Sequence, residues 1–534
     1  MNGSYQFASN PHIDLSLSAE NVPMQYLALM ARHAKRDLPS DMNMSGMLSA
    51  VLTVRGDYGN RVWAGSGQVS DVEIRSSVLT KPVVIASSRW SLVGPGTEVA
   101  LPAKPAGKKT TKAKEELPPP TGLAWKVEPV SLKLGENAPA TLAGWFAHDD
   151  YYTELRGEAD LERLFELAKL AGLPKPASEV TGSAKGAVQI SGEWAGFVPA
   201  TITGEAQLKN IVAKFNGVAS PMRIGSAHFV ATKDAFSMNK ATGSFAGVHS
   251  ALEFSALWPQ HCTTAQGADP MTCSLQFNVT ADDLKVEEIN ALLNPKAQKR
   301  PWYAALMEPQ RTKFPEVYAN GQVNAAKLMM KNVTATHFSS RLSISPNGFA
   351  LTSMSADVFG GKYTGQLTSD FSLGKPVYHA TGKLQQVAMP SIAALMKDPW
   401  AAGVATVNVE GQASGWNADE IVSSAFGEAD FDWRDGAMPH VALEADGKPL
   451  HFKSFTGALQ MRNGMFSLSE SKLQTTSGIY QVTGTASLDR RLEVKLSRDG
   501  THPGYTVTGT LEHPTVAAAR PAATRAKLAR TSNR

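Results

Sequence analysis

The chain has 534 residues, of which 43% are hydrophobic and 19% charged, and its formal net charge is +4. This hydrophobic fraction excludes global disorder, and the length is enough for three or four units of ~150 residues. The small, dispersed positive charge argues against nucleic acid as a partner. No apolar run reaches the ~18 residues of a membrane-spanning helix.

A unit that occurs four times organises the chain. Each copy begins with an alternating strand, continues into a short amphipathic helix and then enters a series of strands punctuated by glycine. The copies start at Ile13, Glu154, Leu275 and His379. Self-similarity of this kind is typical of arrays that build an extended surface instead of one compact core.

The domain boundaries that we predict follow these copies. The first β-rich repeat, which we expect the chain to enter partway, covers residues 1–99, and the later repeats cover 121–260, 261–376 and 377–515. Residues 100–120 are rich in Pro, Ala and Lys and are expected to form a linker or an exposed loop. Residues 516–534 are expected to form a basic, disordered tail.

Period-two alternation of apolar and polar residues is the clearest local signal. For example, Leu275, Phe277 and Val279 alternate with Gln276 and Asn278. Such strands have one apolar and one wet face, and they favour antiparallel pairing because parallel strands are apolar on both faces. The pattern therefore predicts a mainly β fold: an extended, curved antiparallel sheet array that forms a groove.

Turn signals agree with this prediction. Asn463-Gly464 and Asn347-Gly348 each stand between two alternating runs, and Asn-Gly supplies the positive φ values of a two-residue hairpin turn. A glycine also opens the first strand after each predicted helix. These glycines are Gly46, Gly182, Gly321 and Gly403.

About four short, capped helices are expected, one in each copy. The second is the best marked, with Asp160 as its N-cap, Leu161 and Leu164 on one stripe, and Gly172 after its end. Pro390 lies in the first turn of the fourth, a position that proline prefers. We expect each helix to pack as a lid on one end of its local sheet. A partner-docking face is the alternative.

The two cysteines, Cys262 and Cys273, lie in the sequence HCTTAQGADPMTC. No second Cys or His pair is near enough to complete a metal site. A disulfide is the simpler interpretation and would place the chain in an oxidising compartment, whereas two free thiols are the alternative.

No catalytic pattern stands out. The chain has no phosphate-binding GxxxxGK[ST] loop, no HExxH and no GxSxG. His148, Asp149 and Asp150 form the densest polar cluster, but three adjacent side chains need distant partners to hold one ion, so a solvated turn is expected. We therefore predict a protein that is not an enzyme and that has no cofactor, no metal site and no small-molecule substrate.

Residues 452–496 carry a resemblance to a known family. The order of strand, capped helix and glycine-rich strands resembles AsmA-like bacterial envelope proteins, which are related to TamB-type bridge-like lipid transfer proteins. The match is strongest with the C-terminal region of that family. The residues that match its motif are Phe455, Leu459, Met461, Asn463, Gly464, Gly484 and Leu488.

This resemblance implies a location and a role. Family members lie in the periplasm, are anchored in the inner membrane by an N-terminal helix, and are implicated in phospholipid transport and outer-membrane assembly. The expected anchor would be a segment that this chain does not contain. Phospholipid or another acyl lipid is the implied partner, and inner-membrane proteins are further candidates.

The function that we expect is a non-enzymatic scaffold that shelters acyl chains in an apolar β-groove. A structural or adhesive β-repeat protein with a closed core is the alternative, and an enzyme with dispersed carboxylates is the third hypothesis. The predicted lining residues are Leu15, Leu17, Leu252, Phe254, Leu275, Phe277, Val279, Tyr480, Val482, Leu492, Val494, Leu496, Tyr505 and Val507.

Overall fold

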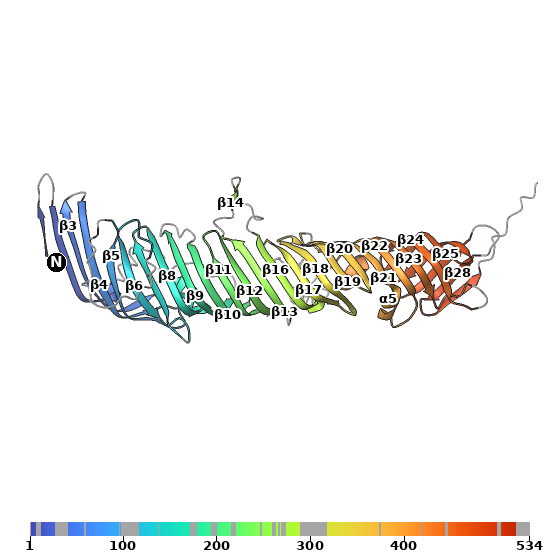
Figure 1. Ribbon diagram of the computed structural model, residues 1–534, viewed down its shortest axis with the longest axis horizontal. Helices are drawn as coiled ribbons and strands as arrows, with labels where there is room; N and C mark the ends of the chain where they lie inside the picture. Colours follow the sequence, from blue (N-terminus) through green and yellow to red (C-terminus); the bar gives the residue numbers. More distant parts are fainter. Residues whose placement is uncertain are drawn as a thin grey trace, which may run out of the picture. The chain divides into compact units, whose positions relative to one another are not determined.

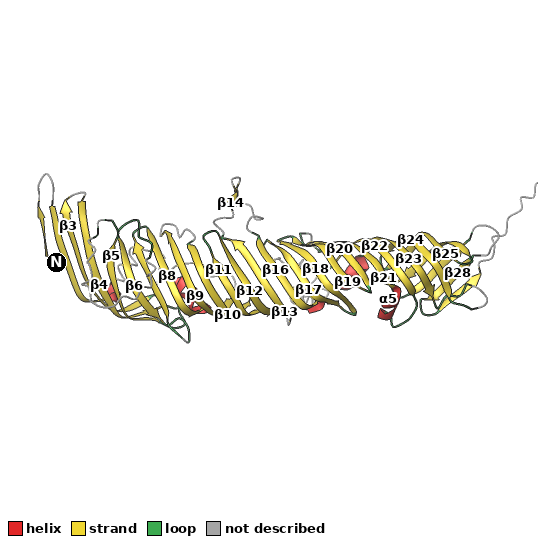
Figure 2. Cartoon of the chain, viewed as in Figure 1, coloured by secondary structure: helices red, strands yellow, loops and turns green. Residues whose placement is uncertain are grey.

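The computed structural model is mainly β, with 27 strands in one hydrogen-bonded sheet (Figures 1 and 2). It describes residues 2–6, 12–26, 41–57, 60–95, 97, 117–136, 138–170, 179–193, 200–214, 221–245, 248–258, 263–264, 267–268, 274–288, 318–372, 375–416, 418–443, 447–498 and 504–518. The chain divides into two compact units. Unit 1 comprises Met1–Phe245 and Ala251–Cys273, and unit 2 comprises Ala246–Ser250 and Ser274–Arg534.

In unit 1 the strands from β1 to β12 pair with their chain neighbours, and every one of these pairings is antiparallel. The elements are β1 Asn2–Gln6, β2 His12–Pro23, β3 Asn43–Asp57, β4 Asn60–Arg75, β5 Val83–Val93, β6 Ala124–Leu132, β7 Ala140–Ala147, β8 Asp150–Asp160, α2 Leu161–Leu170, β9 Glu179–Glu193, β10 Thr201–Lys214, β11 Met222–Ala231 and β12 Ala235–Phe245. They are followed by β13 Val248–Leu257 and a two-stranded pair, β14 Thr263–Thr264 and β15 Gly267–Ala268.

Unit 2 continues with the same architecture. Its elements are β16 Leu275–Lys285, β17 Ala319–Met330, β18 Val333–Ser345, β19 Gly348–Val358, β20 Gly361–Asp370, β21 Val377–Ala388, α5 Met389–Leu395, β22 Ala402–Ser414, α6 Ala418–Ser424, β23 Phe426–Met438, β24 Leu450–Arg462, β25 Met465–Thr475, β26 Gly478–Ser487, β27 Arg491–Ser497, β28 Tyr505–Thr510 and β29 Pro514–Ala518. From β17 to β29, chain neighbours pair antiparallel.

One pairing departs from the predicted antiparallel sheet. β16 and β17 pair in parallel, with Leu275 opposite Ala319 and Val279 opposite Val323. Parallel neighbours need a crossover of a dozen or more residues, and residues 286–318 separate the two strands. Alternation along β16 did not reveal this, because it reports the two faces of a strand and not the direction of its partner.

In each unit, clusters of buried side chains lie toward one line of strand ends. We call this line the core rim. In unit 1 it includes Arg75, Val83 and Asp160, and in unit 2 it includes Ala388 and Thr475. Val83, Leu132, Leu134, Ala140 and Ala159 form one buried cluster of unit 1, and Ile211, Ile224, Ala227, Met238 and Ala241 form another. α2 and α5 begin at this rim, directly after β8 and β21 (Figure 2).

Bulges near the core rim explain why the buried clusters form there. Asp71, Asn210, Ser353, Asp435 and Glu470 have φ values between 46° and 53°, each a few residues from the core rim. Register shifts accompany them, for example between Lys209 and Val212 in β10. A bulge bends its strand and increases the local twist, which brings strand ends together over apolar side chains.

Three of the four glycines that open strands in the sequence lie against these bulges. Gly46, Gly182 and Gly403 have φ values of 120°, 126° and 103°. A Cβ on Gly182 would lie 2.8 Å from the carbonyl oxygen of Asn210, so only glycine fits beside the bulged strand. Gly321, the fourth, lies against Phe277 of the parallel neighbour instead.

The hairpin predictions meet different outcomes. Asn463 and Gly464 have φ values of 50° and 74° and connect the paired residues Arg462 and Met465, which confirms the first turn. In the second, Ser345 pairs with Gly348, so the loop is Pro346-Asn347 and the predicted Asn347-Gly348 turn is wrong by one residue. A proline in the loop removes a donor that a ladder position would need.

The helix predictions are partly tested. α2 begins at Leu161, directly after Asp160, and α5 has Pro390 in its first turn. Of the first and third predicted helices, the structure describes only helical residues 24–26 and 286–288. The short α6, after β22, is an element that the sequence pattern did not indicate. β29 extends to Ala518, three residues into the segment predicted as a tail.

Candidate functional site

The predicted lining residues of β2 lie on an apolar face of unit 1. Leu17 pairs with Leu52 of β3, and Leu52 pairs with Gly65 of β4. A Cβ at Gly65 would lie 2.6 Å from Leu52 Cδ2 and 2.7 Å from Leu92 Cδ1, so side chains from β3 and β5 meet above this glycine. Cross-strand pairing thus joins apolar side chains of several strands into one row.

Part of this face is open to solvent. Leu15 and Leu17 are 43% and 40% exposed, and Trp125 of β6 is 59% exposed. Leu252 and Phe254 of β13 are partly buried and pack against the second cluster of unit 1. The two exposed leucines of β2, beside the partly exposed Leu52 of β3, form an apolar patch that a ligand can cover.

The lining residues predicted in β16 are partly exposed. Leu275, Phe277 and Val279 alternate with exposed polar residues along the strand. The ring of Phe277 lies over Gly321 of β17, where a Cβ would be 2.5 Å from Phe277 Cδ2. The absence of a side chain at Gly321 gives the ring its space.

The lining residues predicted near the C-terminus have different surroundings. Tyr480, Val482, Leu496 and Val507 are only 3–5% exposed. They belong to a large cluster with Met389 and Ala393 of α5 and with Trp433, Phe452 and Phe455, against which Val494 and Tyr505 also pack. Leu492 is partly exposed at the end of the same row. The four buried side chains therefore belong to a closed core, whereas Leu492, Val494 and Tyr505 stay partly exposed at its edge.

Several residues of the unit 1 face were missed in the sequence. They are Leu52, Val54, Trp63, Trp90, Leu92 and Trp125. The signal was present in β4, where Trp63 and Val69 alternate in step with Gly65 and Gly67. Glycines occupy the intervening apolar positions because neighbouring side chains cover them. The ring of Trp90 lies over Gly67, where a Cβ would be 2.6 Å from Trp90 Cε2.

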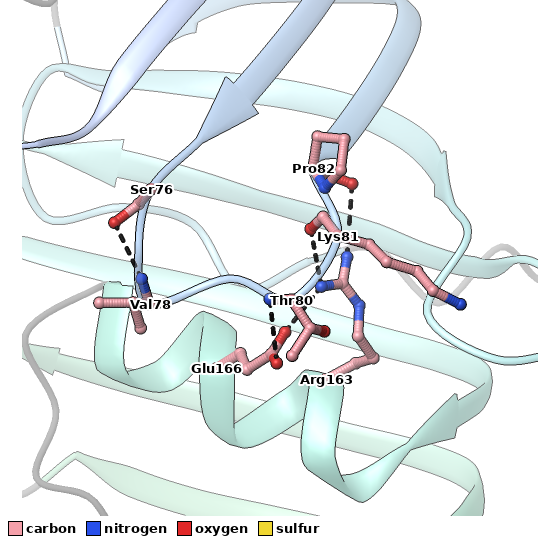
Figure 3. Close-up of polar contacts among 7 residues, drawn as sticks. All are labelled: Ser76, Val78, Thr80, Lys81, Pro82, Arg163 and Glu166. Atoms are coloured by element: carbon pink, nitrogen blue, oxygen red, sulfur yellow. Dashed lines mark hydrogen bonds and ion pairs between the residues drawn. The ribbon is translucent and has the colours of Figure 1, made fainter.

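A buried ion pair holds α2 against the turn between β4 and β5 (Figure 3). The Arg163 guanidinium donates from Nη1 to the Lys81 carbonyl at 2.7 Å and to Glu166 Oε2 at 2.6 Å. Glu166 Oε1 accepts from the Thr80 amide at 3.2 Å. Both side chains are 10% exposed. The pair therefore holds α2 at the core rim of unit 1.

The helix also contributes apolar contacts at this rim. Leu164 and Leu167 of α2 pack against the cluster that contains Leu132 and Leu134. The lid role predicted for this helix agrees with these contacts. The stripe residues Leu161, Leu164, Phe165 and Ala168 are themselves only partly buried.

The polar cluster predicted at His148, Asp149 and Asp150 lies at the exposed turn between β7 and β8. His148 Nε2 lies 3.7 Å from Asp149 Oδ1, and the two side chains are 96% and 89% exposed, as in a solvated turn. Within the described ranges, no three His, Cys, Asp or Glu side chains converge as metal ligands would. Cys262 and Cys273 lie outside the described residues, as do residues 100–116 of the predicted linker.

Among the helices that the structure describes, none has the length and apolar character needed to cross a bilayer. Comparisons of the chain with protein-family models, curated proteins and solved structures find no match.

Proposed function

We propose that this chain is a non-enzymatic envelope scaffold of the AsmA-like type that shelters lipid acyl chains on the apolar face of its sheet. The observation that carries the proposal is the open part of the unit 1 face, where Leu15, Leu17 and Trp125 are 40–59% exposed on strands whose register joins them to further apolar rows. Exposed apolar side chains in contiguous rows are unfavourable in water unless something covers them.

The free-energy cost of exposing acyl chains to water supports an acyl chain as the group that covers these side chains. Exposing an acyl chain to water costs ~0.8 kcal/mol per CH₂, so a 16-carbon tail costs ~13 kcal/mol. Rows from neighbouring strands are spaced by ~4.8 Å, and each strand adds one apolar row. A sheet face can therefore shelter a flexible tail without any precisely placed polar group.

The proposal assigns different roles to the lining residues. Those of β2, β13 and β16 are exposed or partly exposed and are assigned to lipid contact. The C-terminal set around Tyr480 and Leu496 is assigned to the closed core that ends unit 2. In the proposed setting the protein is periplasmic and held at the inner membrane by a further segment, and it contributes to lipid transport and outer-membrane assembly.

A structural or adhesive β-repeat protein remains the second candidate. The closed C-terminal cluster favours it, because an apolar face buried by its own side chains takes no lipid. The two candidates differ in whether the unit 1 face is occupied by lipid when the protein is purified.

The test is mass spectrometry of phospholipid bound to gently purified protein, with two matched variants. Leu17→Asp places a charge on the apolar face at a 40% exposed position. Val51→Asp places the same charge at a 48% exposed position on the opposite face, where Val51 pairs with Ser18 and Ser66. We expect at least twofold less bound phospholipid for Leu17→Asp and unchanged binding for Val51→Asp.

Thermal melts of both variants serve as the folding control. Equal lipid loss in the two variants would contradict the face assignment. Wild-type protein that carries no phospholipid under gentle extraction would favour the structural candidate instead.

A further inference from the structure

The apolar face of unit 1 is banded from one line of strand ends to the other. β4 shows the order most simply. From the core rim it presents Ile74 and Val72, then Val69, then Trp63, and its first residues are Asn60 and Arg61. The order along the strand is aliphatic, aromatic, then polar.

The aromatic band continues across neighbouring strands at the line of strand ends opposite the core rim, which we call the aromatic rim. The rings of Trp90 and Trp125 are 6.2 Å apart. Trp125 pairs with Phe146 of β7, and Phe146 pairs with Tyr151 of β8. These residues come from the ends of β5 to β8 that lie away from α2.

A second aromatic group lies at the same rim of unit 1. Phe236 is 4.8 Å from Trp258 and 6.3 Å from Phe254, measured between ring centroids, and 6.4 Å from Phe229. Trp258 donates from Nε1 to the Thr232 carbonyl at 2.8 Å, so its ring has one apolar and one polar end. The group follows the ends of β11 and β13 and the start of β12.

The core rim of unit 1 has a different composition. The cluster around Leu132 contains only Val, Leu, Ile and Ala side chains. In the cluster around Ile224 the only aromatic contact is the partly buried Phe254. Of the aromatic residues named on these strands, Trp63, Trp90, Trp125, Phe146 and Tyr151 lie at the rim away from the aliphatic clusters, and Phe254 contacts both the second aromatic group and the Ile224 cluster.

A charged residue follows the aromatic band on the apolar face. Arg61, in step with Trp63, lies at the first end of β4 and pairs with Gly56 of β3. The exposed pairs Arg55–Asp14 and His12–Asp57, at the same ends of β2 and β3, lie on the opposite face of the sheet. Burial raises the pKa of the Tyr151 phenol above its usual value.

This order matches a molecule that is apolar at one end and polar at the other. Trp and Tyr are favoured where an apolar phase meets water, because each ring combines an apolar body with a polar group. A protein helix or a second copy of the chain would need polarity that changes across its face, not from end to end.

We infer that phospholipid lies on the unit 1 face with its chain ends toward the core rim and its ester and headgroup region at the aromatic rim. The inference rests on the proposed function and adds the orientation of the lipid. Trp63 and Val69 are six residues apart, ~20 Å along a strand. One leaflet of acyl chains occupies half of a ~30 Å hydrocarbon layer, ~15 Å, so acyl chains that begin at Trp63 extend most of the way to Val69.

The test uses depth-dependent quenching at three positions of β4. A fluorescent amino acid such as acridonylalanine replaces Trp63 at the aromatic rim, Val69 nearer the core rim, or Val62, which is 41% exposed on the opposite face. Each full-length variant is loaded with phosphatidylcholine that carries a nitroxide either on the headgroup or near the end of one acyl chain.

We expect position 63 to be quenched at least twofold more strongly by the headgroup nitroxide than by the chain-end nitroxide. Position 69 should show the reverse preference, and position 62 should respond to neither. Trp125, which is 59% exposed, provides a second rim position if the residue 63 variant does not fold.

The outcomes separate the two claims. Equal or reversed preferences at positions 63 and 69, with lipid bound, would overturn the orientation and leave the proposed function standing. No bound lipid and no quenching at any position would overturn both. Quenching only at position 62 would overturn the face assignment.

Discussion

Arg163 shows how much one polar side chain contributes to this sheet. The residue is 8% exposed. Its guanidinium donates to the carbonyls of Lys81 and Pro82, which are far away in the sequence, and to the carboxylate of Glu166, one helical turn along α2. A buried charge is tolerated only when it is paired and hydrogen-bonded, as here. No periodicity marked this residue, because it interrupts the apolar stripe of α2.

Replacing Arg163 with Ala should destabilise the contact between α2 and the β4–β5 turn by about 3–5 kcal/mol, since Glu166 would keep its charge in a buried place without its partner. Hydrogen exchange of the amides in α2 and at the start of β5 measures this change. Arg75→Ala is the control, because the Arg75–Glu73 pair is largely exposed and should have little effect. Equal protection in the two variants would refute the assignment.

At the scale of elements, the recurring unit is a strand opened by a glycine beside a bulged strand. Gly46 lies against the bulge at Asp71, Gly182 against Asn210, and Gly403 against Asp435. The glycines were visible in the sequence as a periodic feature. Their reason was not, since the bulge is formed by an Asn or Asp on a different strand.

Gly182→Ala should lower the free energy of unfolding of unit 1 by more than about 1 kcal/mol, because φ is +126° and the new Cβ would lie 2.7–2.9 Å from atoms of Asn210 and Ile211. The matched control is Gly225→Ala in β11, whose Cβ would meet its nearest neighbour at 3.6 Å. The measurement is the denaturant midpoint of unfolding, which should be lower for Gly182→Ala than for Gly225→Ala. A similar midpoint for both would show that the bulge yields to the added methyl group.

At the scale of the whole molecule, some apolar rows of the sheet are partly exposed and others are buried. In unit 1 the rows at the aromatic rim are partly exposed, whereas in the last strands of unit 2 they are buried in a cluster that includes α5. Repeat arrays are stabilised mainly by contacts between neighbours, so a defect in one region leaves distant regions folded.

Val494→Asp tests this independence. Val494 packs against the C-terminal cluster, so a carboxylate there should destabilise β24 to β28 by several kcal/mol. Hydrogen exchange should rise in those strands and stay unchanged in β6 to β9. Glu493→Lys, on the exposed side of the same strand, should alter neither region. Loss of protection throughout the chain would mean that both units unfold as one.

The sequence by itself determined the mainly β class, the two faces of strands such as β16 and β26, the start of α2 and the Asn463-Gly464 turn. These features depend on neighbours within a few residues, which alternation and turn chemistry report directly. The tertiary structure alone decided which apolar rows are buried, that β16 and β17 run in parallel, and where Arg163 finds its partners. Burial and strand direction depend on chain segments far apart in sequence, and no local pattern carries that information.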